Sequence, residues 1–350
     1  MIAIGMPRHQ LHLVHRSVVF VALATFATSV ISSAPVRALS ECRKGDFEKI
    51  AVVGHGMTSF VFLARHIRTR QVFAIKRIPK SWMQTPTAIA NEPQMLRLMQ
   101  GISFVVKLYC SMSDSSYEYL VMEFCQGGEL YELVLYDGPL QERHAKFYAA
   151  SIVLALEQMH ERGIIYRDLK LQNVLLTTTG QVRLTDAGFS KRLAAGARTR
   201  SFLGTPEYMA PEIYKGKDYD HSVDWWSLGV VIYQMLFKKV PFEFRDGDFP
   251  TQWERIFSRS LDISSDVLSV AVQNIIRGLL CQSPESRLGS RGAHEVKNHE
   301  WFSDIDWDAL AQERVPPPFI ADFTGDTDLS LFDMDWVQRN VNTTPEFEDF

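Results

Sequence analysis

Residues 166–176 read YRDLKLQNVLL, and the spacing of polar residues in this stretch is the strongest signal in the chain. Asp168 can orient a hydroxyl group and accept its proton. Asn173, five residues later, can bind a metal ion, and Lys170 can neutralise charge that develops on a phosphate. The stretch therefore indicates phosphoryl transfer, with Asp168, Lys170 and Asn173 as candidate catalytic residues.

A glycine-containing stretch lies upstream, at residues 54–61 (GHGMTSFV), between two apolar runs. Gly54 and Gly56 would let backbone N–H groups approach phosphates closely. A glycine turn in a β-hairpin explains the same residues, so this signal is weak alone. Ser59 also holds the position where a third glycine would be expected.

Two further charged residues, Lys76 and Asp186, are candidates for binding phosphates and a metal ion. Lys76 lies inside an apolar run, and its ammonium group needs a partner such as Glu92 unless it points to solvent at an edge. Asp186 precedes Gly188 and could bridge a metal ion to phosphates. The order of glycine loop, lysine, glutamate, Asp-x-x-x-x-Asn and Asp-x-Gly matches the protein-kinase set.

The rest of the chain predicts an α+β fold of two lobes. Its 350 residues are 46% hydrophobic, enough for one large domain or two lobes. Short β-rich runs at 47–54, 59–67, 71–78, 105–112 and 117–124 are interrupted by one helical window, 91–99. Helical periodicity follows at 140–162, 225–237 and 267–280. We expect an N-terminal segment (1–40), a small β-rich N-lobe (41–125), a larger helical C-lobe (126–302) and a C-terminal tail (303–350).

The chain resembles the Ser/Thr protein kinases from about residue 47 to its last residue. RTRSFLGTPEYMAPE (198–212) resembles an activation segment, and SVDWWSLGVVIYQML and NHEWFSDIDWDAL resemble the AGC group. The terminal FEDF is similar to the hydrophobic motif of the cyclic-AMP-dependent kinases. The resemblance implies the bilobal protein-kinase fold, with a tail wrapped over the N-lobe, and transfer of the ATP γ-phosphate to serine or threonine in proteins that carry upstream arginines.

The resemblance also assigns roles residue by residue. Asp168 would be the catalytic base, Lys170 would support the γ-phosphate, and Asn173 and Asp186 would bind Mg²⁺. The residues implied to bind ATP are Gly54, Gly56, Val61, Ala74, Lys76, Glu92, Met122, Glu123, Cys125, Leu175 and Phe332.

Outside the ATP site, the resemblance implies further contacts. Ser201 would carry an activating phosphate received by Arg167 and Lys191, and Glu212 would pair with Arg287. The residues implied for substrate binding and for docking of the tail are Glu129, Thr205, Phe347 and Phe350.

Several positions depart from the family pattern. Ala187 replaces a phenylalanine that would stack with Leu96, Leu108 and Tyr166, and Pro93 follows Glu92, so the helix there should begin near Asn91. The residues that stand in place of an expected histidine and of two expected glutamates are Ala88, Gln172 and Gln234. The departures keep open an alternative function, a pseudokinase or weakly active scaffold.

Charge and cysteine content bound the partners. The formal net charge is −4, and acidic residues concentrate after Glu300, which leaves a body too weakly basic to predict nucleic-acid binding. The four cysteines are scattered, as in a reduced, cytoplasmic protein. Expected cofactors are ATP and Mg²⁺, and an inhibitory regulatory subunit is a candidate partner.

The N-terminus points elsewhere. A basic start is followed by an uncharged run, 17–35, and a small-residue site near Val36. This resembles a secretory signal peptide, and its length also suits a marginal membrane anchor. An amphipathic lead-in helix or a misassigned start codon are the alternatives, and membrane contact is expected only if the segment is an anchor.

Overall fold

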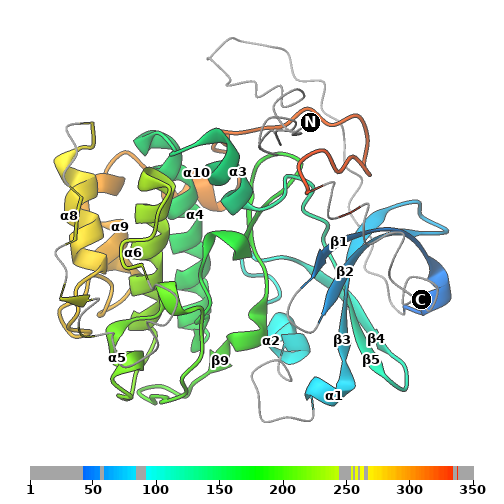
Figure 1. Ribbon diagram of the computed structural model, residues 1–350, viewed down its shortest axis with the longest axis horizontal. Helices are drawn as coiled ribbons and strands as arrows, with labels where there is room; N and C mark the ends of the chain where they lie inside the picture. The colour runs from blue at the N-terminus through cyan, green and yellow to red at the C-terminus, as the bar shows by residue number, and fades with distance from the viewer. Residues whose placement is uncertain are drawn as a thin grey trace, which may run out of the picture.

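The protein has two lobes, one built on a β-sheet and one on helices, which lie side by side (Figure 1). The structure, a computed structural model, describes residues 42–55, 59–83, 92–243, 261–263 and 267–333, together with positions 254, 257, 258 and 337. The predicted α+β bilobal fold is confirmed. Residues 1–40, Gly56, Ala88, Asn91 and the terminal FEDF lie outside the described residues.

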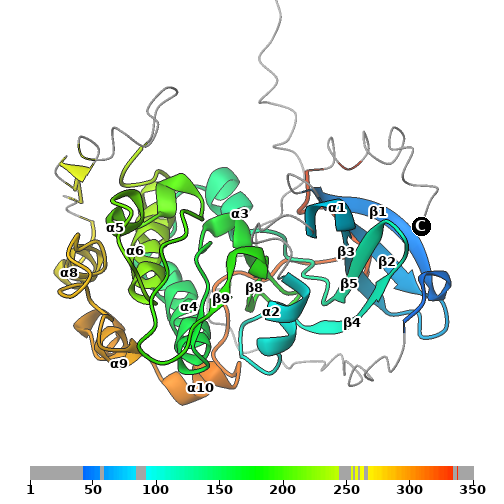
Figure 2. The same cartoon turned by 90° about the horizontal axis from the view of Figure 1, so that it is seen from below.

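A five-stranded antiparallel sheet forms the N-lobe, in the order β1-β2-β3-β5-β4. Its strands are β1 (Phe47–His55), β2 (Phe60–His66), β3 (Val72–Pro79), β4 (Leu108–Ser113) and β5 (Tyr117–Met122). A short helix, α1 (Lys80–Met83), follows β3, and α2 (Glu92–Leu98) packs against β4 and lies between the lobes (Figure 2). Pro93 is the second residue of α2, a position where proline's missing N–H is harmless.

The C-lobe is organised around two long helices, α4 (Glu142–Glu161) and α6 (Ser222–Phe237), which pack against each other. α6 is buried almost all round, as its sequence predicts, with Trp225 and Trp226 fully enclosed. The other helices are α3 (Leu130–Asp137), α5 (Pro211–Tyr214), α8 (Val270–Leu279), α9 (Ala293–Lys297) and α10 (Trp307–Ala311).

Two small antiparallel ribbons flank the stretches that carry the predicted catalytic residues. β6 (Ile164–Ile165) pairs with β9 (Lys191–Arg192), and β7 (Val174–Leu176) pairs with β8 (Val182–Leu184). The loop of Asp168 lies between β6 and β7, and Asp186 lies between β8 and β9. The ribbons therefore bring the two predicted stretches to one edge of the C-lobe, facing the sheet.

The chain after α10 returns to the N-lobe, as expected for the predicted tail. Gln126 Nε2 donates to the carbonyls of Gly325 and Asp328, at 2.6 and 3.0 Å. Arg65 on β2 forms an ion pair with Asp326 at 2.9 Å. The described tail thus spans the linker between the lobes, residues 123–129, and reaches the sheet (Figure 1).

The cysteines differ from expectation. Cys42 and Cys110 form a disulfide across a Cα–Cα distance of 6.3 Å, joining the segment before β1 to β4. The expectation of a fully reduced chain is wrong for this pair, because residues 68 positions apart in sequence meet at one face of the sheet. Cys125 and Cys281 are free thiols. In the described part of the chain, no helix has the length and apolar character needed to cross a bilayer.

The pairing of Glu212 with Arg287, implied by the family resemblance, is confirmed. Arg287 donates from Nη1 and Nη2 to both carboxylate oxygens of Glu212, at 2.7 and 2.8 Å. It also donates to the carbonyls of Ser222 and Cys281 and lies over the ring of Trp226. The guanidinium group therefore connects the end of the activation segment to α6 and to the segment after α8.

Replacement of Glu212 by glutamine should strongly destabilise the C-lobe, because the enclosed guanidinium group of Arg287 would lose its charge partner. Breaking a buried pair costs about 3–5 kcal/mol. The Tm should fall by roughly 10 °C, measured by differential scanning calorimetry.

The matched control is Asp218→Asn. It removes the exposed pair with Arg200, whose side chains are 68% and 53% accessible for Arg200 and Asp218. That change should cost less than about 1 kcal/mol. Equal Tm values for the two variants would contradict a structural role for the buried pair.

Candidate active site

The loop that carries Asp168 is held by a buried carboxylate from α6. Asp224 is fully enclosed and accepts hydrogen bonds from the backbone N–H groups of Tyr166 and Arg167, at 2.9 and 2.8 Å. His160 Nε2 lies 2.8 Å from the same carboxylate. Arg167 has a φ of 69°, a left-handed conformation that is unfavourable without such support. Asp224 thus fixes the backbone immediately before Asp168.

Asp168 lies at the centre of a polar cluster. Asn173 Nδ2 donates to Asp168 Oδ2 at 2.9 Å and to its carbonyl at 2.8 Å. Lys170 Nζ lies 3.0 Å from Oδ2 of Asp168, and it donates to Thr205 Oγ1 at 2.9 Å. The Thr205 hydroxyl donates to Asp168 Oδ1 at 2.7 Å, so this oxygen is placed to accept from a hydroxyl group.

An ion-pair chain faces this cluster across the lobes. Lys76 Nζ on β3 lies 2.7 Å from Glu92 Oε1 on α2 and 3.3 Å from Asp186 Oδ1. Burial lowers the pKa of Lys76, but the carboxylates of Asp186 and Glu92 outweigh it and hold that pKa above its usual value. The Lys76 ammonium in turn lowers the pKa of Asp186. Both groups are therefore charged at neutral pH.

Asp186 and Ala187 form a sharp bend. Asp186 adopts a left-handed conformation, with φ 55° and ψ 72°, and its side chain accepts from Gly188 N. Ala187 is buried in the same core as Leu96 and Tyr166, with Leu108 packed against it. The Tyr166 hydroxyl donates to the carbonyl of Thr185. The backbone at Asp186 is thus supported by contacts that do not need a large side chain at position 187.

The residues expected at the adenine end line the linker between the lobes. Met122 is buried at the end of β5, opposite Ala74 on β3, and Val61 on β2 pairs with both Gly54 and Lys76. Leu175 lies on β7, on the C-lobe side. Among the described residues, the carbonyl of Glu123 and the N–H of Cys125 have no hydrogen-bond partner. An acceptor and a donor at one edge suit an adenine ring.

The tail contributes one aromatic ring to this region. Phe332 stacks on Phe124, with ring centroids 5.8 Å apart and an interplanar angle of 20°. Phe332 was expected here from the family resemblance, whereas Phe124 was not. The sequence signals Phe124 only as an aromatic residue two positions after the end of β5.

Ser201 lies in a basic surrounding. Arg167 Nη1 donates to Ser201 Oγ at 3.0 Å, and Thr199 Oγ1 lies 3.0 Å from the same hydroxyl. Lys191 Nζ donates to Thr199 Oγ1 at 2.9 Å. The two residues expected to receive a phosphate on Ser201 therefore meet at its hydroxyl, one directly and one through Thr199.

The expected substrate-binding residues lie near Asp168. Thr205 bonds to it, as described above, and Glu129 precedes α3. Burial, with a smaller contribution from Glu132, raises the pKa of Glu129 to about 7. The side-chain oxygen of Gln172 is buried and has no partner among the described atoms.

The predicted metal ligands fit a hard cation. Asn173 uses its amide nitrogen on Asp168, and Asp186 uses Oδ1 on Lys76 and Gly188. Within the described part of the chain, Asn173 Oδ1 and Asp186 Oδ2 make no hydrogen bond, and Mg²⁺ prefers such oxygen ligands. No group of three or more His, Cys, Asp or Glu side chains among the described residues forms a site on protein ligands alone.

Two important residues were not anticipated. Asp224 was not recognised as the anchor of the catalytic loop, although a carboxylate on an otherwise apolar helix signals a buried partner. Arg183 lies on β8, between two buried apolar residues, and pairs with Glu123. An arginine inside an apolar strand carries the same signal as Lys76.

Comparison with known proteins agrees with this geometry. The protein kinase domain family matches residues 47–302. The protein kinase C zeta type of Oryctolagus cuniculus is 38% identical over 322 residues, covering 87% of this chain and 53% of the relative. The atypical protein kinase C of Drosophila melanogaster is 37% identical, covering 86% and 52% of the two chains.

A plant protein is also similar. The serine/threonine-protein kinase AtPK1/AtPK6 of Arabidopsis thaliana is 36% identical, covering 86% of this chain and 64% of the relative. The chain thus spans about half to two thirds of the length of these relatives. Since the family match covers well over half of the chain, and the Lys76, Asp168, Asn173 and Asp186 positions of the motif meet in one site, the chain belongs to the protein kinase domain family.

Proposed function

We propose that the protein is an ATP-dependent Ser/Thr protein kinase of the AGC group. The observation that carries the proposal is the cluster of Asp168, Lys170 and Thr205, which faces the Lys76–Asp186 pair. The relative named as a serine/threonine-protein kinase, AtPK1/AtPK6 of Arabidopsis thaliana, supports the same acceptor class.

The residues divide the work of phosphoryl transfer. The carbonyl of Glu123 and the N–H of Cys125, which have no partner among the described residues, suit the adenine ring. Lys76, held by Glu92, would contact the α- and β-phosphates. Asn173 and Asp186 would hold Mg²⁺, which neutralises phosphate charge when bound.

Acceptance of the hydroxyl proton falls to Asp168. The substrate hydroxyl would take the place of the Thr205 hydroxyl at Asp168 Oδ1 and transfer its proton to that oxygen as its own oxygen attacks the γ-phosphorus. Lys170 stabilises the charge that builds up on the transferred group. The bond from the γ-phosphorus to the β–γ bridging oxygen breaks, and ADP leaves.

The pseudokinase alternative rests on Ser59, Ala187 and Pro93. Asp186 keeps its bend and its contact with Lys76 without a large neighbour, which favours retained metal binding. We therefore prefer an active enzyme.

Substrate choice follows from charge near Asp168. We propose that Glu129 recognises an arginine upstream of the acceptor, similar to the selection by cyclic-AMP-dependent kinases. Gln234 accepts from the Tyr208 hydroxyl at 2.6 Å, inside the lobe, and a neutral amide offers weaker pairing than a glutamate. Arginine three residues before the acceptor should therefore matter more than arginine two residues before it.

The localisation remains a separate proposal. The simplest proposal is a cytoplasmic kinase. An inhibitory regulatory subunit is a candidate partner. Residues 1–40 could instead direct the kinase to a membrane or to secretion. Comparing the distribution of the full chain with that of a chain lacking this segment distinguishes these destinations.

Phosphate transfer from radiolabelled ATP to a peptide set with arginine at each upstream position tests the function, with Asp168→Ala as the blank. Arginine three residues upstream should raise kcat/KM by about 10- to 100-fold, the effect of a charge-assisted hydrogen bond. The gain in kcat/KM should increase from about pH 6 to pH 8, because arginine pairs with the ionised form of Glu129, whose pKa is raised to about 7. For the same reason, Glu129 should release a proton when the arginine peptide binds.

Glu129→Gln is the matched control. It should remove both the arginine preference and its pH dependence while leaving KM for ATP unchanged. An arginine preference that survives this change would refute the assignment of Glu129. Phosphate transfer by the unaltered chain that is no faster than transfer by Asp168→Ala would refute the function.

Phosphorylation of Ser201 should raise activity, since a phosphate would form charge-assisted bonds with Arg167 and Lys191. Phosphate-free protein, verified by mass spectrometry, should show a kcat at least about 10-fold below that of the modified form, equivalent to about 1.4 kcal/mol. Ser201→Ala serves as a control, because it removes the acceptor hydroxyl, leaves Arg167 and Lys191 in place and should keep the kcat of the phosphate-free form. Equal activity of the two phosphorylation states would exclude the switch.

A further inference from the structure

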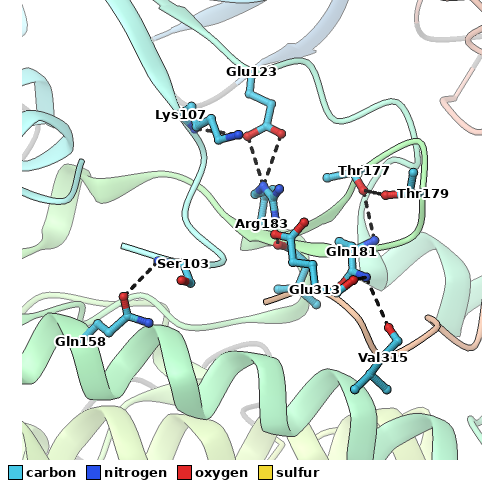
Figure 3. Close-up of polar contacts among 11 residues, drawn as sticks. Ser103, Lys107, Glu123, Gln158, Thr177, Thr179, Gln181, Arg183, Glu313 and Val315 are labelled. Carbon is cyan, nitrogen blue, oxygen red and sulfur yellow. Dashed lines mark hydrogen bonds and ion pairs between the residues drawn. The ribbon is translucent and has the colours of Figure 1, made fainter. Parts of the chain in front are cut away.

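Arg183 is the meeting point of three segments that are distant in sequence. It lies on β8 and its side chain is only 8% exposed. Its Nε donates to both carboxylate oxygens of Glu123, at 3.3 and 3.1 Å, and its Nη1 donates to Glu313 Oε1 at 2.7 Å. Figure 3 shows the guanidinium group between the two carboxylates.

The buried charge of Arg183 holds Glu123 and Glu313 in fixed positions around it. A buried guanidinium group is costly unless it is paired and hydrogen-bonded, and Arg183 meets both conditions because it also donates to the carbonyl of Val182 at 2.9 Å. Burial lowers the pKa of Arg183, but Glu123 and Glu313 outweigh it and raise it above its usual value. The guanidinium group therefore stays charged, and its planar fork fixes the direction of both partners.

Each of the three segments has a separate task in nucleotide binding. Glu123 belongs to the linker, and its carbonyl at the adenine edge has no hydrogen-bond partner in the part of the chain that the structure describes. Arg183 is in register with Leu175 on β7 and lies three residues before Asp186. Glu313 begins the tail that returns to Gln126 and Phe124.

The backbone of Glu123 is tied down as well. Its N–H donates to the carbonyl of Lys107 at 2.9 Å, and the Lys107 N–H lies 3.4 Å from Glu123 Oε2. The Glu123 carboxylate thus points away from the adenine edge, towards Arg183 (Figure 3). Its side chain is free to act on the position of the linker without touching the nucleotide.

We propose that Arg183 is a positioning residue for ATP, which holds the adenine edge of the linker at a fixed distance from the Asp186 end of β8 and couples both to the tail through Glu313. The inference rests on the proposed function, because it concerns the same nucleotide site. It predicts that Arg183 matters for ligands that bind both ends of the site at once, and hardly at all for ligands that bind only the linker.

The chelate effect supplies the physical reason. A ligand held at two points gains affinity only when the two binding elements are placed at the spacing of the ligand. ATP contacts the linker through adenine and the Lys76–Asp186 end through its phosphates, whereas adenosine lacks the phosphates. Loosening the spacing should therefore weaken ATP far more than adenosine.

The test compares Arg183→Met with the unaltered full-length chain. Methionine retains much of the buried aliphatic volume and removes the fork and the charge. The Kd of Mg-ATP, measured by isothermal titration calorimetry, should rise by about 10-fold or more, and the Kd of adenosine should change by less than about 2-fold. KM for ATP should rise in parallel, with KM for a peptide unchanged.

Two further variants keep the test decisive if Arg183→Met folds poorly. Glu123→Gln should weaken ATP in the same selective way, and adding it to Arg183→Met should cause little further loss, because the pair is already broken. Arg183→Lys should restore part of the ATP affinity, since a point charge replaces the fork.

Glu157→Gln is the control for charge removal. It breaks the pair with Lys297 in the C-lobe, where side-chain exposures are 24% and 22% for Lys297 and Glu157, far from the linker. This variant should leave the ratio of the ATP and adenosine affinities unchanged.

If the ratio of the ATP and adenosine affinities were unchanged in Arg183→Met and Glu123→Gln, even with a lower Tm, the cluster would have only a structural role. That result would overturn the inference. Calorimetric binding needs no phosphate transfer. If the chain bound ATP without transferring phosphate, the proposed function would fail while a selective loss in Arg183→Met would still support the inference.

Discussion

The contact between Asp224 and the backbone of the catalytic loop is the interaction on which the rest of the site depends. A carboxylate with no exposure to solvent receives two backbone N–H groups and faces His160. Such a group is stable in the interior only while these partners remain. The loop is therefore tied to the most buried helix of the protein, and the position of Asp168 follows from that of α6.

The two lobes share one continuous apolar core, and polar contacts also join them. Lys76 connects β3 to α2 and to Asp186, Arg183 connects β8 to the linker, and Gln126 connects the linker to the tail. Ala187 lies among apolar side chains between them and gives up the packing that a larger residue would supply. In this account, directional contacts rather than the side chain at position 187 set the geometry of the site.

The sequence predicted elements well where periodicity is strong and less well where pairing is decided at long range. The helical window 225–237 became α6, and the run 117–124 became β5, because both have a clear apolar pattern. The run 105–112 yielded a strand only from Leu108. The backbones of Val105 and Val106 pair with Leu184 on β8 instead of with β5.

Site residues with a recognised motif were located from sequence, whereas their supports were not. Lys76 and Glu92 were expected to pair from the family resemblance, because a lysine in an apolar strand alone also fits an edge lysine that points to solvent. Arg183 presents the same local pattern, but neither of its partners, Glu123 nor Glu313, is near in sequence. The Cys42–Cys110 bond was missed for the same reason, since spacing alone does not reveal which strands become neighbours.

Amide hydrogen exchange of residues 164–170 in the Asp224→Asn variant tests the central claim most directly. Asparagine keeps one acceptor oxygen and turns an N–H₂ group towards the other backbone donor, so the loop should lose one of the two bonds that anchor it. Exchange in this loop should be faster by about 10-fold or more, with α4 and α6 still protected and phosphate transfer lost. Unchanged exchange in the loop, together with full activity, would contradict the claim that Asp224 positions Asp168.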